Sequence, residues 1–321
     1  MKITVILCTY NRCQKLPKAM ESVLATGSSA HVGWELLVVD NNSKDETRQV
    51  VEEFARRSDG RVRYVFESRQ GKSFALNRGI QEASGDVIAF VDDDVLVEPS
   101  WLRALVAPLE SDDACAGTGG RILPLWDAPM PAWLPPEGGE IMAPLVSFIP
   151  NQGEGSLLTE PPFGTNMAFR REMFSKYGGF RTDLGPRPGN EIRSEDTEFG
   201  QRLLDAGETV RYAPSAIVYH PVGPERLTKK YFLQWYFDKG RADVIVVSGK
   251  FEGYRILGVP VRFFMRAVTG SARWMMTLSP HKRFNRKRQL WVLFGAIAQC
   301  FLMRSAATKL TAAPRCEGSG T

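Results

Sequence analysis

The stretch GDVIAFVDDDVLVEPSWL, residues 85–102, decides the fold class. Its residues 87–91 form an unbroken apolar run rich in β-branched side chains, which is typical of a parallel strand buried on both faces. Residues 3–8 form a second apolar run, residues 34–39 and 62–66 also read as strands, and helical patterns separate these strands about every 25 residues. This alternation predicts an α/β fold with a mostly parallel sheet and helices on both of its faces.

Polar side chains follow three of these predicted strands at the point where each strand ends. They are Thr9-Tyr10-Asn11-Arg12, Asp40-Asn41-Asn42-Ser43 and Asp92-Asp93-Asp94. In a sheet of this kind the ligand crevice lies beyond the carboxyl ends of the strands. We therefore expect the three clusters to share one site.

The three consecutive aspartates are typical of a divalent metal site. Asp92 and Asp94 alternate along the chain and face the same side of an extended segment, where their charges repel unless a cation lies between them. Oxygen ligands that leave positions for water and phosphate suit Mg²⁺ or Mn²⁺. The alternative interpretation is an acidic turn that caps the helix expected to begin near Ser100.

The sequence lacks the common glycine-rich nucleotide sites. No GxGxxG follows the first strand, and no Walker A lysine loop occurs. A nucleotide still fits the predicted edge if a metal ion and basic side chains hold its diphosphate. Lys72 and Arg78 are candidates for that contact, with a solvated helix face as the alternative.

Six stretches together resemble family 2 glycosyltransferases, which have the Rossmann-like GT-A fold. The resemblance covers residues 3–220 and implies a nucleotide-sugar glycosyltransferase domain over residues 1–220. In family order the stretches are ILCTYNR (6–12), VVDNNSKDET (38–47), GKSFALNRGI (71–80), the opening stretch (85–102), PFGTNMAFRREMFSKYGGF (162–180) and SEDTEFGQRLLDAGETVRYAPSAIVYH (194–220).

The resemblance implies roles for individual residues. Asp196, preceded by Glu195, matches the pair whose aspartate is the catalytic base. The aspartate triplet matches the DxD element, so the implied ligands of Mn²⁺ or Mg²⁺ are Asp94 and Asp92, completed by His220. The candidates for nucleotide-sugar binding are Thr9, Tyr10, Arg12, Asp40, Lys72, Arg78, Asp92, Asp93 and Asn166.

These residue types suit an inverting transfer of a hexosyl-type sugar. One carboxylate takes the proton of the acceptor hydroxyl, while the metal and basic groups stabilise the leaving diphosphate. Asp196 is expected at a helix start, where the helix dipole favours its ionised form. The alternatives are a helix-terminal charge pair for Glu195 and Asp196, and a purely structural His220.

A stretch rich in proline and glycine, residues 124–160, interrupts the strand and helix patterns. Prolines at this density exclude a regular helix or an inner strand. We expect a loop on the acceptor side, with Trp126 and Trp133 either stacking on sugar rings or pinning the loop to the protein.

The last part of the chain, residues 221–321, has a different composition. It contains eighteen Lys and Arg against five Asp and Glu, whereas the whole chain of 321 residues has a net charge of only +5. Its apolar run at 289–303 spans 15 residues between charges, and a membrane span needs about 20. We expect a mainly helical, basic, amphipathic region that lies on an anionic membrane surface. The alternative is a helical subdomain packed on the catalytic domain.

The expected partners follow from these features. They are a nucleotide-diphosphate sugar donor, expected to be a UDP-sugar, and a glycan or lipid-linked acceptor of cell-surface glycan synthesis. No nucleic-acid motif accompanies the basic region, so we expect no nucleic-acid partner. Five cysteines without framework spacing and the lack of a secretory signal suggest a cytoplasmic protein, peripheral at the inner face of the membrane. Alternative functions are a non-catalytic GT-A binding module and a nucleotidyltransferase.

Overall fold

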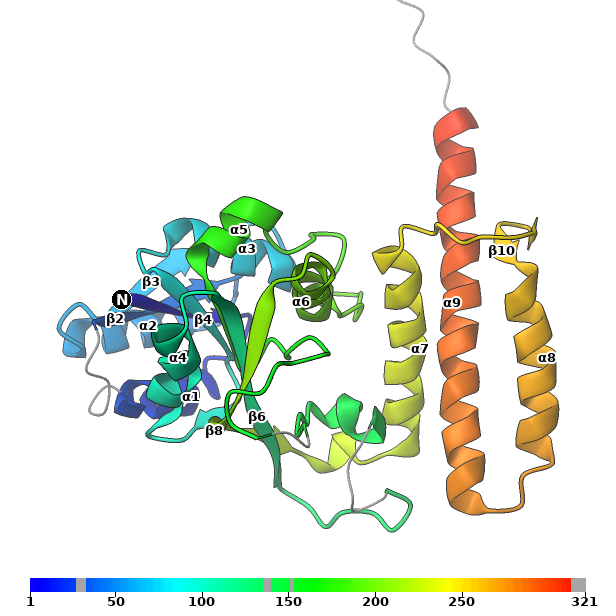
Figure 1. The fold of residues 1–321 in the computed structure, drawn as a ribbon, viewed down its shortest axis with the longest axis horizontal. Helices are drawn as coiled ribbons and strands as arrows, with labels where there is room; N and C mark the ends of the chain where they lie inside the picture. The colour runs from blue at the N-terminus through cyan, green and yellow to red at the C-terminus, as the bar shows by residue number, and fades with distance from the viewer. Residues whose placement is uncertain (27–32, 135–139, 151–152, 313–321) are drawn as a thin grey trace, which may run out of the picture. The chain divides into compact units, whose positions relative to one another are not determined.

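The computed structural model describes residues 1–26, 33–134, 140–150 and 153–312. The chain divides into two compact units, Met1–Thr228 and Lys229–Thr321 (Figure 1). The sequence-based boundary after residue 220 lies close to this division. The roles assigned to the two parts stay predictions.

The first unit contains an eight-stranded sheet with the strand order β3-β2-β1-β4-β7-β6-β8-β5. The predicted α/β fold with a mostly parallel sheet is confirmed: β1 to β4 are mutually parallel, and β6 is parallel to β8. Strand β7 runs antiparallel between β4 and β6, and β5 is antiparallel to β8. The bounds are β1 (Ile3–Thr9), β2 (Trp34–Asp40), β3 (Val62–Phe66), β4 (Val87–Asp92), β5 (Leu96–Val97), β6 (Cys115–Trp126), β7 (Met167–Arg170) and β8 (Thr209–Val222).

Helices cover both faces of the sheet, as predicted (Figure 1). Along β1, Val5 and Leu7 pack with residues of α1, α2 and α4, whereas Ile6 packs with residues of α3, α5 and α6. This alternation buries both faces and explains the continuous apolar strands. The helices are α1 (Leu16–Ala25), α2 (Thr47–Arg57), α3 (Lys72–Glu82), α4 (Trp101–Ser111), α5 (Arg171–Tyr177) and α6 (Glu195–Asp205).

The strand register brings the predicted polar clusters to one edge of the sheet. Thr9 of β1 pairs with Asp40 of β2, and Cys8 pairs with Asp92, the last residue of β4. Directly beyond β1 and β2, Asn11 and Asn42 have positive φ angles of 51° and 64°. Asparagine tolerates this left-handed conformation better than most residues, so the chain turns sharply there and keeps the cluster side chains at the edge.

The segment 124–160 contains more regular structure than the sequence predicts. Strand β6 continues to Trp126 and pairs with β8 there, and a short 3-10 helix, η2, covers Glu140–Leu145. Residues 135–139 and 151–152, including two of the prolines, lie outside the described residues. The acceptor-side role of this segment stays a prediction.

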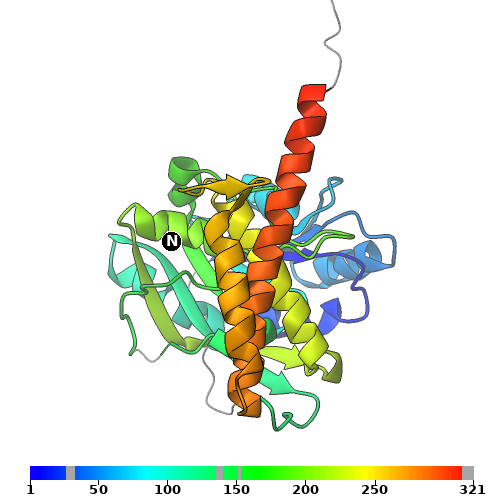
Figure 2. The same ribbon diagram turned by 90° about the vertical axis from the view of Figure 1, so that its right-hand side faces the viewer.

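The second unit is mainly helical. It consists of α7 (Lys229–Val246), the short strands β9 (Arg255–Ile256) and β10 (Val259–Pro260), α8 (Val261–Met275) and α9 (Pro280–Ala312). Within this unit α9 contacts both α7 and α8, and α8 and α9 lie side by side in both views (Figure 1, Figure 2). No helix among the described residues combines the length and hydropathy of a membrane span.

Candidate active site

Lys72 joins the two acidic parts of the predicted site. It is the first residue of α3, and its ammonium donates a hydrogen bond of 2.7 Å to Asp92 Oδ1 at the end of β4. The same ammonium lies 3.7 Å from Glu195 Oε1, on the first turn of α6. The aspartate cluster and the Glu195-Asp196 pair therefore belong to one site.

The charges of this group depend on each other. Burial disfavours the charged form of Lys72, but the carboxylates of Asp92 and Glu195 outweigh burial and raise the pKa of the amine. In turn Lys72 overcomes burial at Asp92 and lowers the pKa of that carboxyl. Burial and the neighbouring charge of Asp196 instead raise the pKa of Glu195 to about 7. Among the described residues Glu195 Oε2 has no hydrogen-bond partner.

The other two aspartates of the triplet contact the end of β1 and the turn after it. Thr9 Oγ1 donates a hydrogen bond of 2.7 Å to Asp93 Oδ2, and Arg12 lies 3.2 Å from Asp94 Oδ2. Burial, followed by the charge of Asp94, raises the pKa of Asp93 to about 6. The edge thus gathers carboxylates and cations from β1, α3 and β4.

A second arginine approaches Asp94 from the far end of β8. Arg226, in the 3-10 helix η3 (Pro224–Arg226), lies 3.8 Å from Asp94 Oδ2 and 3.1 Å from His220 Nε2. Burial lowers the pKa of His220, so its imidazole is neutral near pH 7 and Nε2 is an acceptor. His220 Nδ1 is buried and has no partner among the described residues.

The backbone around Asp196 fixes its carboxylate. Gly164 N donates to Asp196 Oδ2 at 2.6 Å, and Thr197 N donates to Oδ1 at 2.7 Å. A Cβ added at Gly164 would lie 2.9 Å from Asp196 Oδ2, so any larger residue there would displace the Asp196 carboxylate. Ser194, directly before α6, has a positive φ of 85°, which indicates a strained helix start held by its surroundings.

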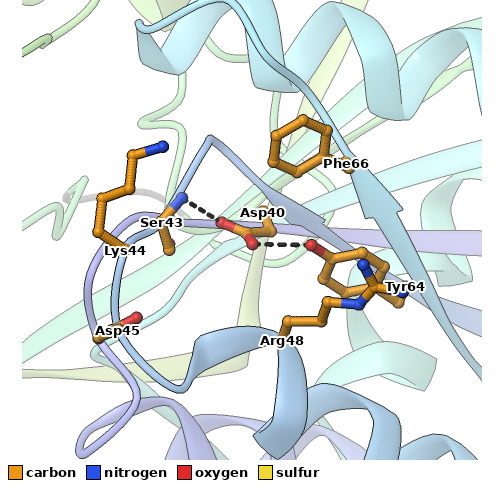
Figure 3. Close-up of a pocket in the computed structure, with 7 residues that line it drawn as sticks. All are labelled: Asp40, Ser43, Lys44, Asp45, Arg48, Tyr64 and Phe66. Carbon is orange, nitrogen blue, oxygen red and sulfur yellow. Dashed lines mark hydrogen bonds between the residues drawn. The ribbon is translucent and has the colours of Figure 1, made fainter.

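Asp40 borders a cavity of about 330 Å³ at the ends of β2 and β3 (Figure 3). Its carboxylate accepts hydrogen bonds from Tyr64 Oη at 2.8 Å and from Ser43 N at 2.9 Å. Phe66 is 47% exposed and offers an aromatic face at the same cavity. The cavity is lined by Asp40, Ser43, Lys44, Asp45, Arg48, Tyr64 and Phe66.

Two predicted residues do not join the acidic group. Arg78 is ion-paired with Glu82 one turn further along α3, at 2.8 Å. The Asn166 amide is buried and accepts from Trp101 Nε1 at 2.8 Å while donating to two backbone carbonyls. Its polar atoms already have protein partners, so we remove Asn166 from the proposed donor contacts. Tyr10 is 37% exposed at the edge.

The predicted metal ligands are each contacted by a basic side chain. Among the described residues no group of three or more His, Cys, Asp or Glu side chains is arranged to hold a metal ion. Lys72 donates to Asp92, Arg12 and Arg226 contact Asp94, and Arg226 also contacts His220. The ligand roles of Asp92, Asp94 and His220 stay predictions.

Comparison with known proteins identifies the family. A family model described as glycosyl transferase family 2 matches residues 4–178, more than half of the chain. The protein is a family 2 glycosyltransferase. The solved structure of a mannosyltransferase from Pyrobaculum calidifontis, in complex with GDP-Man and Mn²⁺, has a TM-score of 0.55 at 17% identity. That comparison covers 97% of this chain and 88% of the other, and it confirms the GT-A fold.

Two curated relatives extend over most of this glycosyltransferase. A glucosyl-dolichyl phosphate glucuronosyltransferase of Haloferax volcanii is 28% identical over 68% of this chain and 69% of its own length. The succinoglycan biosynthesis protein ExoM of Rhizobium meliloti is 26% identical over 79% of this chain and 78% of its own length.

Sequence reasoning missed three contributors to the glycosyltransferase site. Arg226 lies beyond the family motifs, and only the return of the chain after β8 brings it to Asp94. Gly164 was visible as part of a motif, but its contact with Asp196 depends on packing between segments far apart in the sequence. Tyr64 alternates within an ordinary strand pattern, which gives no sign of its bond to Asp40.

Replacing Glu195 with Gln should change how stability depends on pH. The folded state keeps a proton on Glu195 up to about pH 7, whereas an ordinary glutamate releases it near pH 4.5. The wild type therefore loses stability as pH rises through this window, and Glu195→Gln lacks this loss. Urea denaturation with a chelator present should show the wild-type free energy of unfolding falling relative to that of the variant.

The exposed Glu172 on α5 provides the matched control, because Glu172→Gln changes the same side chain outside the site. The free energy of unfolding of the wild type minus that of Glu195→Gln should fall between about pH 4.5 and pH 7. A difference that stays constant or rises over this range would contradict the raised pKa of Glu195.

Proposed function

We propose that the protein transfers a sugar from a nucleoside-diphosphate sugar to an acceptor hydroxyl, with inversion at the anomeric carbon. The observation that supports this most strongly is the contact of Lys72 with both Asp92 and Glu195. This contact brings the strand edge, where a diphosphate would bind, next to Asp196, where a base is needed.

The donor nucleoside is proposed to bind across the ends of β1 and β2. Thr9, Tyr10 and Asp40 lie at this edge, and the cavity beside Asp40 combines carboxylate oxygens with the aromatic face of Phe66. Such a pocket accepts a base by stacking and by hydrogen bonds. We keep a UDP-sugar as the proposed donor, with Lys72 and Arg12 as the cations nearest to its diphosphate.

The residues present fit a divalent metal ion bound together with the donor. Asp94 supplies a hard oxygen and His220 a neutral, buried imidazole, and both donor types suit Mn²⁺. Arg226 contacts both groups, so a bound ion would compete with its guanidinium for them. A bound ion would stabilise the charge that develops on the leaving nucleoside diphosphate. Solved structures with this fold carry Mn²⁺ with GDP-Man or with UDP.

Asp196 is the proposed base. The acceptor oxygen attacks the anomeric carbon, its proton passes to the Asp196 carboxylate, and the bond to the diphosphate oxygen breaks. The backbone N–H groups of Gly164 and Thr197 orient the carboxylate toward the acceptor side. Glu195 contacts the ammonium of Lys72 and is proposed to position Lys72 next to Asp196.

The proposed setting is the synthesis of a cell-surface glycan or its lipid-linked precursor, at the cytoplasmic face of the membrane. The names of the two relatives support this setting, since one acts on a dolichyl-phosphate-linked sugar and the other belongs to succinoglycan biosynthesis. The acceptor is then a glycan or lipid-linked hydroxyl.

Asp196→Asn should reduce sugar transfer by about a thousandfold or more, because general-base catalysis contributes roughly 10²–10⁴-fold. Donor binding should stay within about threefold of wild type, since the amide keeps the shape of the carboxylate. Asp205→Asn, at the exposed end of the same helix, is the matched control. Nucleoside diphosphate release and donor titration measure the two quantities.

Normal turnover by Asp196→Asn would remove this residue from the mechanism. Release of pyrophosphate by the wild type would instead indicate a nucleotidyltransferase. Donor binding by the wild type with no turnover on any acceptor would indicate a binding module.

Arg226→Met should strengthen Mn²⁺ binding in the absence of nucleotide by on the order of tenfold. The guanidinium then no longer competes for Asp94 and His220 Nε2, and hydrogen bonds to charged groups contribute roughly 1.5–3 kcal/mol. Arg78→Met removes the same side chain from another position of the first unit and should leave Mn²⁺ binding unchanged. Calorimetric titration with MnCl₂ provides the readout, and equal affinities of both variants would contradict the proposed ligands.

A further inference from the structure

One side of α8 is apolar and exposed. Of its residues only Phe263 is buried, in the small core that it forms with Val244 and Val259. The helical repeat of 3.6 residues places four other side chains on a common outer side. They are between 63% and 72% exposed: Met265, Val268, Met275 and, directly after the last residue of α8, Met276. We call these four residues the α8 apolar face.

Arginines border this face along its whole length. Arg262, Arg266 and Arg273 recur at helical spacing next to the apolar face, and all three are exposed. No ion pair joins any of the three to an acidic side chain within the described residues. From residue 261 to residue 312 the sequence has ten Lys and Arg and no Asp or Glu. The helix therefore presents an apolar strip and an unbalanced positive strip side by side.

Exposed apolar and basic side chains also occur in the turn between α8 and α9 and at the start of α9. Leu278 is 94% exposed there, followed by the exposed Lys282 and Arg283. Trp274 lies under two cations, with Arg283 at 5.3 Å and Lys287 at 5.8 Å from its ring. Indole rings, long basic side chains and exposed leucine are the residues that favour the boundary between lipid headgroups and acyl chains.

We propose that the α8 apolar face and its three bordering arginines form the surface by which the protein docks on an anionic lipid bilayer. The helix lies in the plane of the interface, with methionine and valine side chains among the acyl chains and the guanidinium groups on lipid phosphates. The inference deepens the proposed action on a membrane-bound acceptor and rests on that proposal for its purpose.

Charge complementarity decides between the partners that this surface fits. A second copy of the chain would bring an equally basic strip against the first, and like charges would repel. A nucleic acid would satisfy the arginines but leave the four apolar side chains in water. An anionic bilayer offers phosphates to the arginines and acyl chains to the apolar side chains at the same time. A helix that lies in the interface does not have to be long enough to span the bilayer.

Vesicle flotation of the full-length protein tests the proposal. Wild type should bind mixed phosphatidylglycerol–phosphatidylcholine vesicles and bind pure phosphatidylcholine much more weakly, with the difference reduced by salt. The triple variant R262Q/R266Q/R273Q should lose roughly a hundredfold in binding, because each basic residue near an anionic surface contributes to the affinity. The variant M265Q/V268Q/M275Q/M276Q should lose about tenfold or more, because its apolar contacts are gone while glutamine preserves the helix.

The matched control, R56Q/R103Q/R171Q, removes three exposed arginines from the first unit. It has the same net charge as the arginine variant of α8 and should bind vesicles like wild type. Circular dichroism and nucleoside diphosphate binding, unchanged in every variant, separate this result from a failure to fold or from a failure of the proposed catalytic site.

Equal loss in the control variant would show that only net charge matters and would overturn the proposal. Unchanged vesicle binding by both α8 variants would overturn it as well. If the wild type does not bind vesicles but dimerises through α8 or binds RNA there, the surface belongs to a different partner and the proposal is overturned. Vesicle binding is measured without acceptor or turnover, so its result does not depend on whether the proposed transfer reaction is correct.

Discussion

A partly buried ammonium between two sets of carboxyl groups is the interaction on which the first unit depends. Asp92 ends a central strand and Glu195 begins α6, and the ammonium of Lys72 lies between these two carboxyl groups. Removing the ammonium would leave Asp92 without its cation in a partly buried space, so the position of Lys72 is constrained. The same ammonium places a cation at the edge where a diphosphate is proposed to bind. A positive charge at position 72 is therefore needed both for the stability of this group and for the proposed binding of the diphosphate.

The parts of the site that sequence alone predicts are the local ones. The apolar run before Asp92 and the carboxylates after it lie in one short stretch, so the strand, its burial and its acidic end can be read together. Asn166 shows the limit, because this polar residue within a family motif gave no sign that its amide would accept a hydrogen bond from Trp101 inside the core. Arg226 shows the same limit from the other side, since its contact with Asp94 depends on where β8 ends. Patterns predict elements and their ends, whereas contacts between distant segments follow from packing.

The division of charge along the chain also has a physical meaning. In the first unit Asp92 lies near Lys72 and Asp94 lies near Arg12, so part of the site's charge is paired before any ligand arrives. In the second unit the arginines of α8 have no acidic side chains nearby in sequence, and the charge faces outward beside apolar side chains. A balanced site suits a small anionic ligand that exchanges repeatedly, and an unbalanced surface suits an extended anionic partner.

The most direct test of the account is thermal unfolding with nucleoside diphosphates, each with and without Mn²⁺, for wild type and Asp94→Asn. We predict that one nucleoside diphosphate stabilises the wild type only when Mn²⁺ is present. At about 100 times the dissociation constant the gain is about 2.7 kcal/mol, and Asp94→Asn should lose it. If no nucleoside diphosphate changes the unfolding temperature of the wild type in the presence of Mn²⁺, the result contradicts the proposed donor site.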